Sequence, residues 1–139
     1  MNKALLLDNI KNHNEYPDYL DWMSKINGHA GDREWVKRAL TPDRLIGGYC
    51  EDFAAYFCYK YGIEMYFLND VHDIMCIDGK YYDGWNVEGV DSLSDLEYVK
   101  RYMKTWSEDQ LQSTLKVDEE WKNYNVFVKN FSTILKQGA

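Results

Sequence analysis

Three side chains near the middle of the chain have the types and the order of a thiol-based catalytic site: Cys50, His72 and Asp83. In such a site a cysteine sulfur attacks a carbonyl carbon, and a histidine acts as its general base. A carboxylate fixes which ring nitrogen of the histidine carries the proton and stabilises the imidazolium. Whether these three residues meet depends on the elements that carry them.

His72 and Asp83 lie on a predicted β-hairpin of residues 71–85, because Asp78-Gly79 between two strand-like runs favours a two-residue type I′ turn. In that register the pairs are Ile77 with Lys80, Cys76 with Tyr81, Met75 with Tyr82, Ile74 with Asp83, Asp73 with Gly84, and His72 with Trp85. Since side chains alternate between faces, His72 and Asp83 share one face as diagonal neighbours, roughly 7–8 Å apart at the backbone. A slip of one residue in the register places Asp73 on that face instead.

Cys50 begins the most regular helical pattern in the chain. Apolar residues recur on one face of it: Cys50, Phe53, Ala54, Phe57, Cys58 and Tyr61. Gly62 is well placed to end this helix in a left-handed conformation. Free N–H groups at the helix start favour a thiolate and can hold an oxyanion. If the apolar face packs on the face of the sheet that carries His72, Cys50 reaches the imidazole, whereas Cys58, about 12 Å further along the axis, does not.

Residues 48–54, followed by His72, Asp78-Gly79 and Tyr82-Asp83, resemble the cysteine, histidine and aspartate blocks of the transglutaminase-like superfamily. Related papain-like and NlpC-type proteins, many of them encoded by bacteria or their phages, share this order. The resemblance covers residues 46–90. It implies that the cysteine, histidine and aspartate of these blocks act as nucleophile, general base and orienting acid, through an acyl-enzyme formed from an amide or ester.

The segments around this core are predicted to be mostly helical. Short helices are expected at residues 3–12, 18–26, 32–40, 92–104 and 107–115, with an ambiguous pattern at 118–136, and a strand is expected at 63–68. We therefore expect an α+β fold in one domain (1–139), with a papain-like or transglutaminase-like core in which the cysteine-bearing helix packs on a small antiparallel sheet. Its parts are a helical N-terminal part (1–45), the helix and hairpin core (46–90) and a mostly helical C-terminal part (91–139).

Composition narrows the possible partners and compartment. A formal net charge of −7 argues against broad electrostatic binding to nucleic acid or to an anionic membrane. The chain has no apolar run long enough to span a bilayer and no signal-peptide pattern, so a cytoplasmic protein is expected. Three cysteines without a secretory signal indicate free thiols, and their spacing lacks the short pairs of structural zinc sites, so neither a metal nor a cofactor is expected.

Two functions remain open at this point. The first is a cysteine-dependent hydrolase or acyltransferase acting on a peptide, isopeptide or similar amide. Aromatic residues that could line its substrate cleft are Tyr49, Tyr81 and Trp85. The second is a catalytically silent papain-like scaffold that binds a protein, for example a phage or mobile-element inhibitor of a host protein. Glu51 and Asp52 favour the second function, because their negative charge beside Cys50 works against a thiolate.

Overall fold

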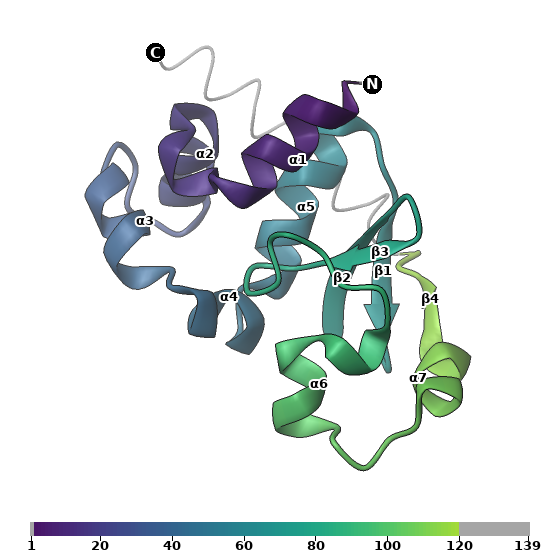
Figure 1. The fold of residues 1–139 in the computed structure, drawn as a ribbon. Helices are drawn as coiled ribbons and strands as arrows, with labels where there is room; N and C mark the ends of the chain where they lie inside the picture. Colours follow the sequence, from purple (N-terminus) through teal and green to yellow (C-terminus); the bar gives the residue numbers. More distant parts are fainter. Residues whose placement is uncertain (1, 120–139) are drawn as a thin grey trace.

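The computed structural model describes residues 2–119 and has a mixed α+β architecture, in which helices pack on both faces of a four-stranded antiparallel sheet (Figure 1). The α-helices in this part of the chain are α1 (Lys3–Lys11), α2 (Pro17–Ile26), α3 (Arg33–Ala39), α4 (Pro42–Gly47), α5 (Cys50–Tyr61), α6 (Glu97–Tyr102) and α7 (Glu108–Thr114). The strands are β1 (Met65–Leu68), β2 (His72–Ile77), β3 (Lys80–Tyr82) and β4 (Leu115–Val117), in the spatial order β3-β2-β1-β4. The α+β class predicted from the sequence is therefore confirmed.

The hairpin of β2 and β3 has the predicted register next to its turn. The observed partners are Ile77 with Lys80, Cys76 with Tyr81, and Met75 with Tyr82. Asp78 and Gly79 both have positive φ angles, 52° and 77°, as a type I′ turn requires. The pairing ends at Tyr82, so the three further pairs predicted from the sequence are not formed.

The side chain of Asp83 ends strand β3 by accepting hydrogen bonds from the backbone of residues that follow it in the chain. Its Oδ1 accepts from the backbone N–H groups of Trp85 and Asn86, at 3.0 and 2.7 Å. Such a turn around an aspartate competes with the ladder of a sheet and diverts the chain. Asp83 therefore lies just beyond the strand.

The two faces of β2 belong to different cores. The first core joins the sheet to α1, α2 and α5, and its sheet residues are Met65, Met75, Ile77 and Tyr82. The second core joins the opposite face to α6 and α7, and its sheet residues include Leu68, Ile74, Cys76 and Tyr81. The sequence left packing of α5 on the face that carries His72 as a condition for Cys50 to reach the imidazole, and this packing is not observed. Because both faces of β2 are apolar, side-chain alternation alone does not decide which helix covers which face.

The N-terminal helices follow the predicted boundaries closely, and α4 is an addition to them. Pro42 occupies the first position of α4, where its missing N–H group has no helical partner to lose. The predicted end of α5 is also confirmed, since Gly62 adopts a left-handed conformation with φ of 67°. None of the helices within residues 2–119 is long and apolar enough to cross a membrane.

Between residues 91 and 119 the chain contains less helix than predicted. The segment expected as one helix at 92–104 forms a short 3-10 turn (Leu93–Asp95) and then α6. Ser107 caps α7 through a reciprocal capping box with Gln110. Strand β4 was not predicted, because three residues are too few to show a pattern; it pairs with β1. Most of the pattern at 118–136 lies outside the described residues.

Candidate active site

Cys50 is the first residue of α5, directly after the short connection that follows α4. The preceding residue, Tyr49, provides no side-chain cap, so the first N–H groups of α5 remain available to a ligand or a thiolate. Cys50 is partly buried, whereas Cys58 two turns later is fully buried in the first core. The start of α5 thus combines a reachable thiol with local positive potential.

His72 is the first residue of β2, and its side chain is fully buried. Its Nε2 lies 2.9 Å from Oδ2 of Asp83, which is the contact expected from the hairpin. The ring of Tyr98, from α6, stacks on the imidazole with centroids 4.1 Å apart and planes 5° from parallel. The carboxylate assigns the proton to Nε2, and the stacked ring fixes the plane of the imidazole.

Asp83 is itself held by several neighbours. Besides the two N–H groups of its turn, the next residue packs closely on α4, where a Cβ added to Gly84 would lie 2.3 Å from Cβ of Leu45. Asn86 in the same turn accepts from the backbone N–H of Glu97, at 2.9 Å, and so links the turn to the start of α6. The orienting carboxylate is therefore fixed by α4 and α6.

The second ring nitrogen of His72 is available to the thiol. Within residues 2–119, Nδ1 is buried and has no hydrogen-bond partner of good geometry. The Cys50 thiol nevertheless lies close enough for each group to shift the pKa of the other through hydrogen bonding and charge. A loose thiol–imidazole contact of this kind is common in sites without a bound substrate.

The electrostatics of the pair favour a thiolate beside an imidazolium. Burial alone would lower the pKa of His72, but hydrogen bonds and charge from Asp83 and Cys50 outweigh it and raise that pKa to about 9. Burial alone would raise the pKa of Cys50. The hydrogen bond and charge of His72, together with the backbone N–H groups of Asp73 and Glu51, outweigh the effect of burial, so the pKa of Cys50 is lowered. Burial instead raises the pKa of Cys58 far above its ordinary value.

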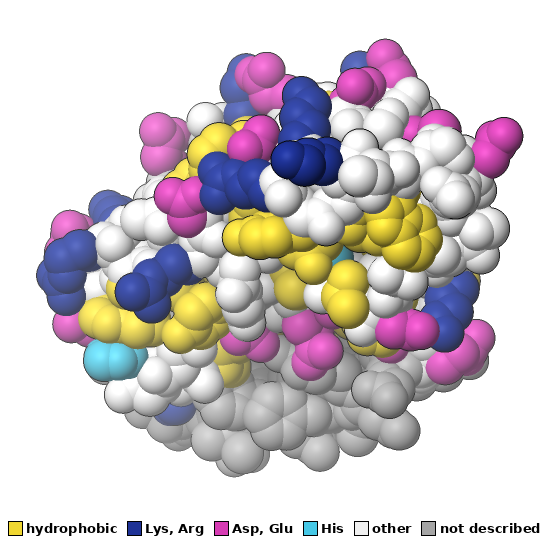
Figure 2. All heavy atoms as spheres, turned by 90° about the horizontal axis from the view of Figure 1, so that it is seen from below, with side chains coloured by type: hydrophobic (Ala, Val, Ile, Leu, Met, Phe, Trp, Pro, Cys, Tyr) yellow, Lys and Arg dark blue, Asp and Glu magenta, His cyan; other side chains and the backbone are white. Residues whose placement is uncertain are grey.

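A cavity of about 620 Å³ opens at Cys50. It is lined by the end of α4, the first turn of α5, the β1–β2 turn and α6, and its aromatic residues are Phe67, Tyr98 and Tyr102. Figure 2 shows hydrophobic side chains gathered across the middle of the face seen from below, with acidic side chains at their lower border. The lining of the cavity at Cys50 likewise combines apolar and acidic side chains.

The aromatic residues expected to bind substrate do not belong to this cavity, as far as the described residues line it. Tyr49 packs against the first core. The hydroxyl of Tyr81 accepts a hydrogen bond from Gln112, and Trp85 packs under the guanidinium of Arg101, 4.5 Å from its ring centroid. The chain leaves the sheet after Tyr82, so Trp85 lies in the turn around Asp83 and not on a strand opposite His72. No motif marked Tyr98 as a neighbour of His72, because α6 reaches the site through tertiary packing alone.

Asp73 points to the other face of β2 from His72, and its environment is strongly acidic. Burial raises the pKa of Asp73, and so do its contact with Asp118 and the negative charges of Cys50 and Glu51. Its backbone N–H, by contrast, supports the Cys50 sulfur. Asp73 therefore belongs to the surroundings of the thiol and does not replace Asp83 as the partner of His72.

A scan against protein-family models finds no match to the chain, and searches of the curated proteins and of the solved structures find none either. The chemistry of the site is therefore inferred from its own residues.

Proposed function

We propose that this protein is a cysteine-dependent hydrolase or acyltransferase that acts on an amide, with a papain-like or transglutaminase-like core. One observation carries the proposal: His72 is buried, with Nε2 2.9 Å from Oδ2 of Asp83, and its Nδ1 has no well-formed hydrogen bond to any residue of 2–119 although the Cys50 thiol lies nearby. Buried polar atoms normally have hydrogen-bond partners, and exceptions often have a catalytic role. The free nitrogen is where a general base must accept the proton of a thiol.

The proposed reaction has two stages, acylation of Cys50 and then deacylation, and the same three side chains act in both. In the resting ion pair the proton of the Cys50 thiol lies on Nδ1 of His72, and the thiolate Sγ attacks the carbonyl carbon while N–H groups at the start of α5 hold the oxyanion. The C–N bond then breaks, and His72 returns the proton to the departing amine. Water or a second amine attacks the thioester, gives a proton to His72, and releases the Cys50 sulfur. Asp83 keeps Nε2 protonated and stabilises the imidazolium.

The cavity supports a peptide or isopeptide substrate. Its volume of about 620 Å³ would accommodate a side chain or a short segment next to the thiol. Aromatic residues such as Phe67 and Tyr98 would bury the apolar part of that group.

The proposal is tested by trapping the acyl-enzyme. Purified protein is treated with p-nitrophenyl acetate, and the acetylated residue is identified by mass spectrometry. We expect a single acetyl group on Cys50, its slow release by water, faster release when a primary amine is added, and loss of the adduct in Cys50→Ala. Cys76→Ser is the matched control, because Cys76 is a partly buried thiol outside the site. A folded protein that is acetylated equally on several residues, or not at Cys50, would contradict the proposal.

A protein-binding function without catalysis is the second candidate. It is supported by large aromatic residues that remain exposed on and beside α6, where Tyr102 is 62% and Trp106 36% exposed. Under this alternative, Cys50→Ala leaves binding of the partner intact, whereas Tyr102→Ala weakens it. Under the enzymatic proposal, Cys50→Ala abolishes acyl transfer.

A further inference from the structure

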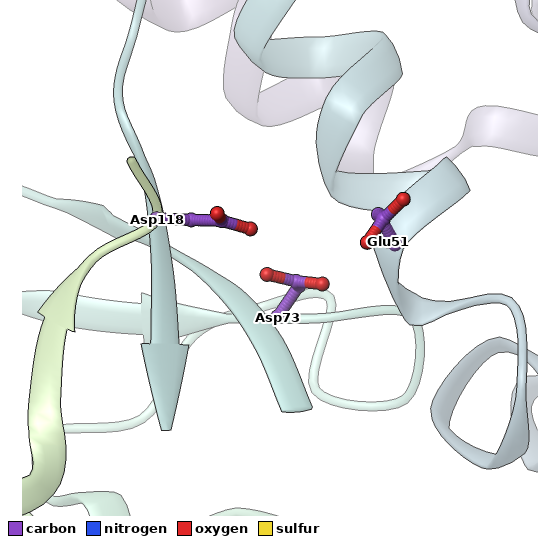
Figure 3. Close-up of side chains that lie close together, drawn as sticks. All are labelled: Glu51, Asp73 and Asp118. Atoms are coloured by element: carbon purple, nitrogen blue, oxygen red, sulfur yellow. The ribbon is translucent and has the colours of Figure 1, made fainter. Parts of the chain in front are cut away.

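Three carboxylates from different parts of the chain converge beside the thiol. Glu51 lies in the first turn of α5, Asp73 in β2, and Asp118 directly after β4. One oxygen of each lies within 4.8 Å of the corresponding oxygens of the other two, and the three groups point toward one another (Figure 3). The backbone N–H of Asp118 donates to the carbonyl of Met65, which fixes this residue against the end of β1.

Two members of this cluster are almost completely buried. Asp73 is 3% exposed and Asp118 is 1% exposed. Glu51 and Asp118 make further interactions. Oδ1 of Asp73, in contrast, is buried with no hydrogen-bond partner in the described part of the chain, although it belongs to the group that points into the cluster. Burying a carboxylate oxygen without a compensating partner is costly, so this atom indicates a missing ligand.

The donor atoms identify the class of that ligand. All are carboxylate oxygens, which hard divalent cations prefer, whereas zinc and copper sites typically include histidine nitrogen or cysteine sulfur. Two oxygens bound to one Ca²⁺ at about 2.3–2.6 Å lie no more than about 5.2 Å apart, while those bound to Mg²⁺ at about 2.0–2.1 Å lie within about 4.2 Å. The separations of up to 4.8 Å between these oxygens fall within the limit for Ca²⁺ and extend beyond the limit for Mg²⁺.

We propose that Glu51, Asp73 and Asp118 form a binding site for a hard divalent cation of the size of Ca²⁺, with water completing the coordination. The prediction that no metal binds rested on the spacing of the cysteines, and the three carboxylates were not considered because they lie far apart in the chain. Glu51 follows Cys50 and Asp73 follows His72, so a cation here joins the start of α5 to the start of β2. It would therefore fix the separation between the thiol and the imidazole without touching either.

The test uses the full-length protein, freed of metal with a chelator. CaCl₂ is titrated by isothermal calorimetry, and thermal unfolding is followed at increasing CaCl₂, with MgCl₂ and with NaCl at equal ionic strength as comparisons. We expect saturable binding of one Ca²⁺ per chain, a melting temperature that rises with CaCl₂, weaker binding of Mg²⁺, and no effect of NaCl beyond ionic strength. None of these measurements depends on catalysis.

Two variants and a control connect the binding to the cluster. Asp73→Asn is expected to abolish the calorimetric signal and the shift in melting temperature. Glu51→Gln, at a partly exposed position that tolerates substitution more readily, is expected to weaken Ca²⁺ binding at least about tenfold, as the loss of a charged ligand does. Asp91→Asn removes one exposed negative charge outside the cluster and should bind Ca²⁺ like the unmodified protein.

Two results would overturn the proposal. One is the absence of saturable Ca²⁺ binding by the folded protein. If Asp73→Asn also raised the stability in that case, the repulsion within the cluster would be relieved by protonation of Asp73 and not by a bound ion. The other is unchanged Ca²⁺ affinity in both Asp73→Asn and Glu51→Gln, which would place the ion elsewhere.

Discussion

The molecule contains two buried histidines in different surroundings. His13, in the 3-10 turn (His13–Glu15) between α1 and α2, is 8% exposed and packs edge-on against Tyr19 and Phe53. Its Nδ1 lies 2.9 Å from the backbone carbonyl of Ile10. His72, at the start of β2, is fully buried and has a carboxylate partner at the same distance.

The partner decides what burial does to each ring. Burial lowers the pKa of His13, and a single carbonyl group does not compensate. At His72 the carboxylate of Asp83 and the thiol of Cys50 outweigh burial, and the pKa rises. A neutral carbonyl thus holds His13 as a structural residue, whereas a carboxylate on one nitrogen prepares His72 to accept a proton on the other.

The largest expected effect separates the two histidines by function. His72→Gln should lower the rate of p-nitrophenyl acetate turnover by about 10²–10⁴-fold, because the general base is lost. His13→Gln removes a buried imidazole of similar size but should leave the rate per folded molecule unchanged. Turnover is measured together with circular dichroism, which reports the folded fraction. Equal losses in the two variants would mean that His72 is also structural.

The second prediction concerns the carboxylate. Asp83→Ala should lower turnover by about 10²-fold or more, because His72 loses the group that orients it. Asp83→Asn should lose at least as much. If its amide oxygen still accepts from the N–H groups of Trp85 and Asn86, its NH₂ group faces Nε2 of His72 and moves the ring proton to Nδ1. Steady-state turnover measures both variants, and an Asp83→Asn variant that keeps the unmodified rate would show that the carboxylate does not set the tautomer of His72.

The third prediction concerns the packing that holds the carboxylate. Gly84→Ala places a Cβ against Leu45 and should lower the free energy of unfolding by about 1–3 kcal/mol, as overpacking does. Gly47→Ala is the matched control, because no atom lies within 4 Å of its added Cβ. Urea unfolding monitored by fluorescence measures both. A neutral Gly84→Ala would show that the turn after β3 can move away from α4 at little cost.

The smallest effect is in the pH dependence of stability and concerns His13. Because the pKa of His13 is lower in the folded protein than its ordinary value of 6.5, the unfolded chain binds the proton more readily. The free energy of unfolding should therefore fall as the pH drops below about 6.5. His13→Phe should flatten this part of the profile, measured by urea unfolding between pH 7 and 5. An unchanged slope would mean that His13 does not titrate differently on folding.

The contact between His72 and Asp83 was predictable from local rules. The Asp78-Gly79 turn sets the register of the hairpin, and alternation then assigns His72 and Asp83 to one side. The helix beginning at Cys50 and its end at Gly62 follow from periodicity and from the conformational freedom of glycine.

The remaining parts of the site depend on packing between distant segments. Which face of β2 meets α5 is decided by competition between two apolar cores, and the stacking of Tyr98 on His72 depends on where α6 docks. Strand β4, which brings Asp118 to the acidic cluster, is too short to be recognised by alternation. Local sequence patterns carry no information about such contacts.

Site-resolved alkylation tests the central claim, that Cys50, His72 and Asp83 act as one unit, most directly. The protein is treated with iodoacetamide at neutral pH, and the labelling rate of each cysteine is followed by mass spectrometry. Cys76 is the informative comparison, because it is also partly buried and its burial raises its pKa to about 12. Cys50 should react faster than Cys76 and Cys58, and His72→Gln should slow Cys50 alone. Slow, equal labelling of all three thiols, or a Cys50 rate unaffected by His72→Gln, would contradict the account.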